Sequence, residues 1–143
     1  MTDKRAVYCE TLRHARALAN WLKSQPLTSD TQIFLINVVP AFAYAEIGEG
    51  AASFQRGHSL IENKHRLALN DLAAQLATTP CRVDQVLLAG SRAEELARFC
   101  NAQDVSQLVL VKPSNFWLER FMMHQLTKKL AAKTHTSVLL IDC

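Results

Sequence analysis

Glycine is scarce in this chain of 143 residues, which contains only four, and the last of them is Gly90. Loops that hold a phosphate between a strand and a helix depend on glycine, because a Cβ atom would keep the anion away from the backbone amides. After the apolar run 108–111 the sequence is KPSNFW, with a proline and two large aromatic residues. We therefore expect no glycine-rich phosphate loop there, although the run itself predicts a buried strand.

Paired cysteines are also absent. Cys9, Cys81, Cys100 and Cys143 form no C-x-x-C motif, and no Cys/His cluster has the spacing of a zinc site. Apolar neighbours favour a core position for Cys9 and Cys100, and Cys143 is the only thiol that we expect to be exposed. Reduced, mostly buried thiols are typical of cytoplasmic proteins, and this is the location that we predict.

Long apolar runs and a strong charge bias are missing as well. No run approaches the ~20 residues needed to cross a bilayer, and the first residues lack the apolar core of a signal peptide. The formal net charge is only +3. The basic residues within 128–135 are typical of the last turn of a helix, so the sequence predicts neither a membrane nor a nucleic-acid partner.

Strand-like and helix-like periods alternate from one end of the chain to the other. The strands are expected at 6–9, 33–39, 83–89, 105–111 and 137–141, and the helices at about 12–22, 58–77, 91–100 and 118–133. A long connection over 40–57 holds the other three glycines. This order predicts one α/β domain over 1–143, with a single five-stranded parallel sheet doubly wound with four helices.

The candidate pocket of such a sheet lies at the carboxyl ends of the strands, where the strand order reverses. Here these ends place Glu10 beside residues 39–40, 90–91 and 112–114. Ser91 and Glu94 have the spacing of a capping box. We attribute Ser91 to that role, since it lacks the flanking glycines of a nucleophile elbow.

His58, Glu62 and His65 stand on one side of the second predicted helix, four and three residues apart. Two imidazoles and a carboxylate are a possible metal-ligand set. The other interpretation is a polar rim at the start of a helix. We favour the rim, because no supporting partner for a metal ligand can be identified in the sequence.

The densest group of aromatic and methionine side chains lies at the start of the last predicted helix. Its members are Phe116, Trp117, Phe121, Met122 and Met123. The favoured interpretation is that they fold over the unused phosphate site and fill it. The alternative is a partly exposed patch for another subunit or protein.

Three stretches resemble the universal stress protein family: FLINVVP at 34–40, VLLAGS at 86–91 and SVLLI at 137–141. The resemblance covers nearly the whole chain, and it implies the same fold and a stress-response role. It also implies that two copies pair through the last strand, Ser137–Ile141. That strand is an apolar edge that would otherwise expose unpaired backbone groups, so pairing is physically reasonable.

Members of this family that bind ATP carry an Asp at the end of the first strand. After the fourth strand they have a Gly, two residues, a Gly, nine residues, and then Gly-Ser or Gly-Thr. In this chain the positions after the fourth strand, the two glycines and the Gly-Ser or Gly-Thr pair, fall on Val111, Ser114, His124 and Gln125. The last two are expected inside a helix. The Asp becomes Glu10, while Val38, which lies beside the adenine in the family, and Gly90 remain.

We therefore expect a non-enzymatic regulatory or scaffold protein that acts as a homodimer, with a degenerate nucleotide pocket, no cofactor and a further protein partner. The alternative is a sensor of ATP, AMP or another small ligand. Its candidate pocket residues are Glu10, Val38, Gly90, Lys112, Ser114 and Gln125. A nucleotide hydrolase is a third hypothesis, but it needs a positioned base and metal ligands that the sequence does not reveal.

Overall fold

The computed structural model of the chain describes residues 2–45 and 51–143, with only the backbone described at 45, 51–56 and 58. Its centre is a five-stranded sheet with the order β3-β2-β1-β4-β5. All neighbouring strands are parallel. The strands are β1 Asp3–Tyr8, β2 Thr31–Val39, β3 Arg82–Ala89, β4 Gln107–Val111 and β5 Ser137–Ile141. The predicted parallel sheet is confirmed.

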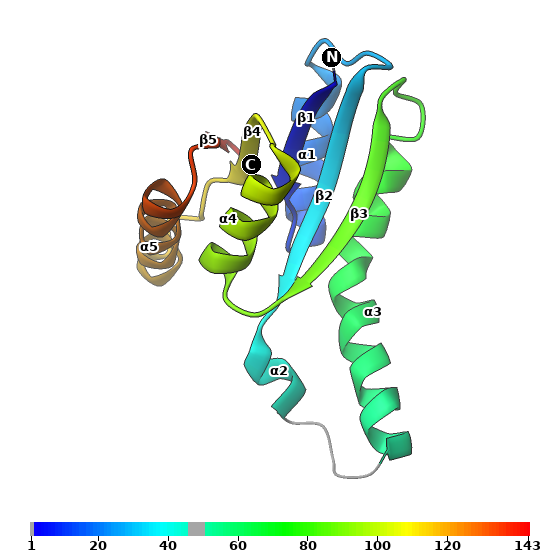
Figure 1. Cartoon of the computed structure of the whole chain (residues 1–143), viewed down its shortest axis with the longest axis vertical. Helices are drawn as coiled ribbons and strands as arrows, with labels where there is room; N and C mark the ends of the chain where they lie inside the picture. The colour runs from blue at the N-terminus through cyan, green and yellow to red at the C-terminus, as the bar shows by residue number, and fades with distance from the viewer. Residues whose placement is uncertain (1, 46–50) are drawn as a thin grey trace.

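Helices cover both faces of this sheet, as Figure 1 shows for α1 and α4 on opposite sides. The helices are α1 Leu12–Lys23, α2 Ala41–Ala45, α3 Ala51–Gln75, α4 Arg92–Gln103 and α5 Trp117–Lys133. Successive strand residues point to opposite faces, so Val7 packs with α1 and α3, whereas Tyr8 packs with α4 and α5. Within the described residues, no helix has the length and hydrophobicity that a transmembrane span requires.

The last helix, α5, joins the core through two buried residues, Leu126 and Leu130. It packs mainly against α4 and makes few contacts with the strands. In Figure 1 it stands beside the sheet rather than across it. The edge strand β5 is therefore less covered than the central strands.

The number of helices corrects the sequence prediction, because the described residues contain five rather than four. The connection 40–57 contains α2, and α3 begins at Ala51 instead of near residue 58. Alanine is frequent here and is the best helix former. Pro40, directly before α2, also has a fixed φ that suits a helix start. Residues 46–50 of this connection lie outside the described part.

Two turns also differ in detail from the prediction. β4 begins at Gln107 instead of 105, because Val105 belongs to a turn in which its N–H donates to the Cys100 carbonyl at 3.1 Å. Ser91 occupies the N-cap of α4, but its side chain makes no capping hydrogen bond. The predicted capping box is therefore wrong. The acidic Glu94 and Glu95 in the first turn stabilise this helix end through its dipole instead.

The thiols lie largely where their neighbours predict. Cys9 and Cys100 are buried, Cys143 is exposed and Cys81 is intermediate. Burial is the main cause that raises the pKa of Cys9 to about 12 and that of Cys100 to about 11. Both therefore stay protonated at neutral pH and lack the thiolate that a nucleophile needs.

Asn37 is a fully buried polar residue that connects β2 to α3. Its side-chain amide donates to the His65 carbonyl at 2.9 Å, and its side-chain oxygen accepts from the Val38 N–H at 2.8 Å. A buried polar group of this kind stabilises the fold only while its partners are in place. Asn37 thus fixes α3 against the carboxyl half of β2.

Replacing Asn37 with alanine should lower the free energy of unfolding by about 1–3 kcal/mol, because two buried hydrogen bonds are lost. Urea unfolding followed by circular dichroism measures this change. The matched control is Asn20→Ala on the exposed side of α1, which should stay within about 0.5 kcal/mol of the parent. Equal stability of the two variants would contradict the assigned role.

Candidate functional site

The strand order reverses between β1 and β4, because β1 pairs with β2 on one side and with β4 on the other. Ligand sites of doubly wound sheets form at this point, outside the carboxyl ends of the strands. A cavity of about 430 Å³ lies there, between the β1–α1 turn, the β4–α5 turn and the start of α4. Its lining residues are Glu10, Thr11, Arg13, His14, Arg92, Val111, Lys112, Pro113, Ser114, Glu119, Met122 and Met123.

An ion pair crosses one side of this site. The Arg92 guanidinium lies 3.8 Å from the Glu10 carboxylate. Arg92 follows β3 and Glu10 follows β1, and β2 lies between those two strands in the sheet. The pair therefore spans the carboxyl end of β2. Val38, near that end, is only 2 % exposed and packs in the core on the α4–α5 face, away from the cavity lining.

A carboxylate of the chain itself occupies the opposite side of the site. Glu119 accepts hydrogen bonds from the Ser114 backbone N–H at 3.2 Å and from the Ser114 hydroxyl. These bonds, the hydroxyl first, lower the pKa of Glu119, with smaller effects from Arg13 and His14. The amide and hydroxyl of Ser114 are thus engaged by an internal anion rather than free for a ligand.

The start of α5 determines whether His124 and Gln125 have free backbone N–H groups. The helix begins at Trp117, so His124 is its eighth residue and Gln125 its ninth. Only the first turn of a helix has unbonded N–H groups. His124 and Gln125 therefore have no free amides for a phosphate. Their predicted position inside the helix is confirmed.

The six candidate residues from the sequence divide into two groups. Glu10, Lys112 and Ser114 line the cavity, whereas Val38, Gly90 and Gln125 are not among its lining residues. The Lys112 ammonium pairs with Asp142 at 3.2 Å.

Gly90 is required by its backbone, since its φ is +132°, and a Cβ atom there would lie 3.2 Å from the Glu95 side chain. Its N–H donates to the Val39 carbonyl at 2.9 Å, so it joins β2 to the turn after β3. That turn accounts for the glycine without a ligand.

Sequence reasoning missed four charged or titratable side chains at the cavity: Arg13, His14, Arg92 and Glu119. Thr11 caps α1 by accepting from the His14 N–H at 3.1 Å, which places the first turn of α1 at the site. The nearness of Arg13 and His14 to Glu10 in the sequence was the available signal. The same signal exists for Arg92, which follows residues 90–91 of the candidate pocket, although its pairing with Glu10 depends on the strand order.

The favoured prediction for the aromatic group is wrong. Phe116, Trp117 and Phe121 are 53 %, 70 % and 55 % exposed, so they do not fill the cavity. Of the group, only Met122 and Met123 line it. The buried positions of α5 are Leu126 and Leu130. At 100° per residue, Trp117 and Phe121 therefore point away from the core.

The possible metal ligands from the sequence analysis, His58, Glu62 and His65, all lie on α3. The side chain of His58 lies outside the described residues. The His65 Nδ1 atom lies 2.9 Å from the Ile61 carbonyl, one turn earlier in the same helix. Within the described side chains, no group of three or more His, Cys, Asp or Glu is arranged to hold a metal ion.

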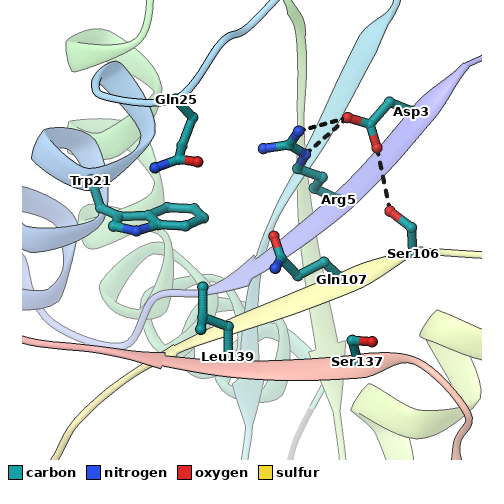
Figure 2. Close-up of a pocket in the computed structure, with 8 residues that line it drawn as sticks. All are labelled: Asp3, Arg5, Trp21, Gln25, Ser106, Gln107, Ser137 and Leu139. Atoms are coloured by element: carbon teal, nitrogen blue, oxygen red, sulfur yellow. Dashed lines mark hydrogen bonds and ion pairs between the residues drawn. The ribbon is translucent and has the colours of Figure 1, made fainter.

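A second hollow, of about 560 Å³, lies at the opposite ends of β1, β4 and β5 (Figure 2). The figure shows Trp21 of α1, and Gln25 just after that helix, above Leu139 of β5. Arg5 and Asp3 close one side as an ion pair at 2.9 Å. This hollow is far from the switch point, and it shows that α1 leaves the start of β5 uncovered.

These features define a doubly wound α/β protein with a cavity at its switch point. A sequence model described as the universal stress protein family matches residues 10–142. The chain therefore belongs to the universal stress protein family. No curated protein matches it in sequence.

Solved structures share the fold at low sequence identity. The hypothetical protein MJ0577 is 15 % identical with a TM-score of 0.73, and the match covers 100 % of this chain and 97 % of that one. A family member from Arabidopsis thaliana with AMP bound is 14 % identical, with a TM-score of 0.67 and coverage of 98 % and 91 %. A universal stress protein in complex with cAMP is 12 % identical, with a TM-score of 0.64 and coverage of 99 % and 97 %.

His14 should make stability depend on pH. Burial is the main cause that lowers its pKa from the ordinary 6.5, with Glu10, Arg13 and Glu119 as the charged neighbours. The unfolded chain takes up a proton as the pH falls below 6.5, whereas the folded chain resists, so stability is lost through this window. In His14→Gln the loss of melting temperature between pH 7.5 and about 5 should be smaller than in the parent. Parallel melting curves for the two proteins across this range would contradict the assignment.

Proposed function

We propose that this protein is a non-enzymatic regulatory member of the universal stress protein family, which acts as a homodimer and whose nucleotide pocket is degenerate. The observation that carries the proposal is the Glu119 carboxylate on Ser114. It supplies a negative charge at the position where the resemblance would place a phosphate. A triphosphate entering there would be repelled by that charge.

The side of the pocket where the adenine base would bind supports the same function. The Glu10–Arg92 pair spans the end of β2, next to the position of Val38 that the resemblance assigns to the adenine. A base in that place would have to separate two charged groups. Arg92 is only 27 % exposed in its side chain, so separation would also cost part of its packing. The base of a nucleotide would therefore contact the Glu10–Arg92 pair, and its phosphates would contact the Glu119 carboxylate.

Millimolar ATP should leave the melting temperature unchanged. A ligand at 100 times its Kd would stabilise the native state by about 2.7 kcal/mol, or roughly 8 °C for a chain of this size. Differential scanning fluorimetry with ATP, ADP and AMP detects such a shift. A rise that grows with nucleotide concentration would overturn the degenerate pocket.

A sensor of AMP or another small anion is the second candidate, because the cavity of about 430 Å³ includes Arg13, Arg92 and Lys112 in its lining. Relatives with AMP or cAMP bound make adenine nucleotides the first ligands to test. Under this alternative AMP raises the melting temperature of the parent, and Arg13→Gln removes the rise. A rise that persists in Arg13→Gln would argue against this cavity.

The proposed dimer uses the free edge of β5. β5 is the last strand in the sheet and pairs only with β4. Hollows flank it on both faces, one lined by Ser137 and Leu139 and the other by Leu140. An apolar edge strand with so little cover is a template for pairing with another strand. A two-fold axis would bring the same edge of a second copy against it.

Leu139→Lys should convert the dimer to a monomer, because two ammonium groups would be brought together at the paired edge. Size-exclusion chromatography with light scattering measures the mass. The control is Leu67→Lys, which changes the charge equally at a side chain that is 60 % exposed on α3. Circular dichroism confirms that both variants fold. A folded Leu139→Lys dimer, or a monomeric parent at high concentration, would refute pairing through β5.

A further inference from the structure

A groove of about 780 Å³ lies between α5, the loop 112–115 and Leu140 of β5. Trp117, Phe121 and Met123 give it apolar walls. α5 packs mainly against α4, and this leaves the groove open along the sheet edge. Large exposed apolar side chains gathered around a concave surface mark a site of association rather than an ordinary surface.

The charges along the groove are of one sign. The charged residues that line it are Lys112 and Arg120, and none of its lining residues is a carboxylate. Lys112 is partly neutralised by Asp142, whereas Arg120 has no ion pair among the described residues.

The only acidic residue of α5, Glu119, is held by Ser114 and lines the switch-point cavity instead. The groove is therefore apolar with a positive rim.

We propose that this groove binds an acidic segment of a partner protein. The segment inserts an aromatic or aliphatic side chain beside Trp117 and Phe121, and it places a carboxylate against the Arg120 guanidinium. Apolar anchors and arginine are the residue types that carry most of the binding energy at protein interfaces. A carboxylate partner for Arg120 supplies the geometry of a charge-assisted hydrogen bond and the choice of an acidic segment over a basic one.

Shape and charge favour this occupant over two others. A bilayer would bury the exposed tips of Trp117 and Phe121, whereas a protruding segment also contacts the loop 112–115 and Leu140 inside the groove. Two copies that met groove to groove about a two-fold axis would bring like charges together, since the axis matches each patch with itself. An acidic segment fills the groove and brings opposite charges together, so it is favoured over both.

This inference rests on the proposed regulatory function and names the class of partner through which it acts. The groove shares the loop 112–114 with the switch-point cavity and Leu140 with the β5 edge. The experiment for the groove therefore substitutes Trp117 and Arg120, which line the groove and not the cavity and lie on α5 rather than β5. Failure here therefore leaves those results unchanged, and the reverse also holds.

A library of random 16-residue peptides displayed on phage, selected on the immobilised full chain, tests the proposal. The enriched peptides should carry net negative charge and at least one aromatic or leucine residue. Synthetic copies should bind the parent by fluorescence anisotropy, more weakly at higher salt. Trp117→Ala and Arg120→Glu should each raise the Kd at least tenfold, and Arg120→Glu should also favour lysine-substituted copies of the peptides.

Matched controls are Leu60→Ala on α3, whose side chain is 70 % exposed, and Arg16→Glu on the exposed side of α1. Both should change the Kd by less than twofold. Neutral or basic selected peptides, or equal binding to the Trp117 and Arg120 variants, would overturn the proposal. So would sedimentation with phosphatidylserine vesicles that Trp117→Ala abolishes, or a parent dimer that the same substitution splits.

Discussion

The early start of α5 is the constraint on which the functional surface of this protein depends. Because the helix begins at Trp117, its free amides lie next to Ser114 and Glu119 instead of at His124. Burial of Leu126 and Leu130 on the inner side of the same helix directs Trp117 and Phe121 outward. The start of α5 thus determines which groups face the switch-point cavity, and its buried leucines leave an apolar surface on the outer side.

The hollows on both faces of β5 form because the helices cover little of this last strand. α1 leaves the start of β5 open on one face, and α5 leans on α4 on the other. The central strands β1 and β2, by contrast, are buried on both faces. The surfaces proposed for association therefore lie toward the edge of the sheet. Its switch point retains a smaller cavity, bordered by the Glu10–Arg92 ion pair and Glu119.

The strands were predictable from the sequence because each is an apolar run between turn residues, and the parallel order follows from the intervening helices. The candidate pocket also placed residues 90–91 beside Glu10, but the pairing of the Arg92 side chain with Glu10 was not predicted, because it depends on the direction that the first turn of α4 gives to that side chain. The orientation of α5 was also hidden. Its apolar residues surround the whole helix, from Trp117 and Met122 to Leu126, so periodicity could not distinguish the inner from the outer side.

The position of His124 as the eighth residue of α5 has a consequence for how this site could change again. Glycine at Val111 or Ser114 alone would not rebuild a phosphate loop, since about two turns of helix would first have to unwind. Such unwinding would remove the backbone hydrogen bonds and the packing of that segment at once. A phosphate loop at this position would thus require several coordinated substitutions, because the loop and the first turns of α5 compete for the same residues.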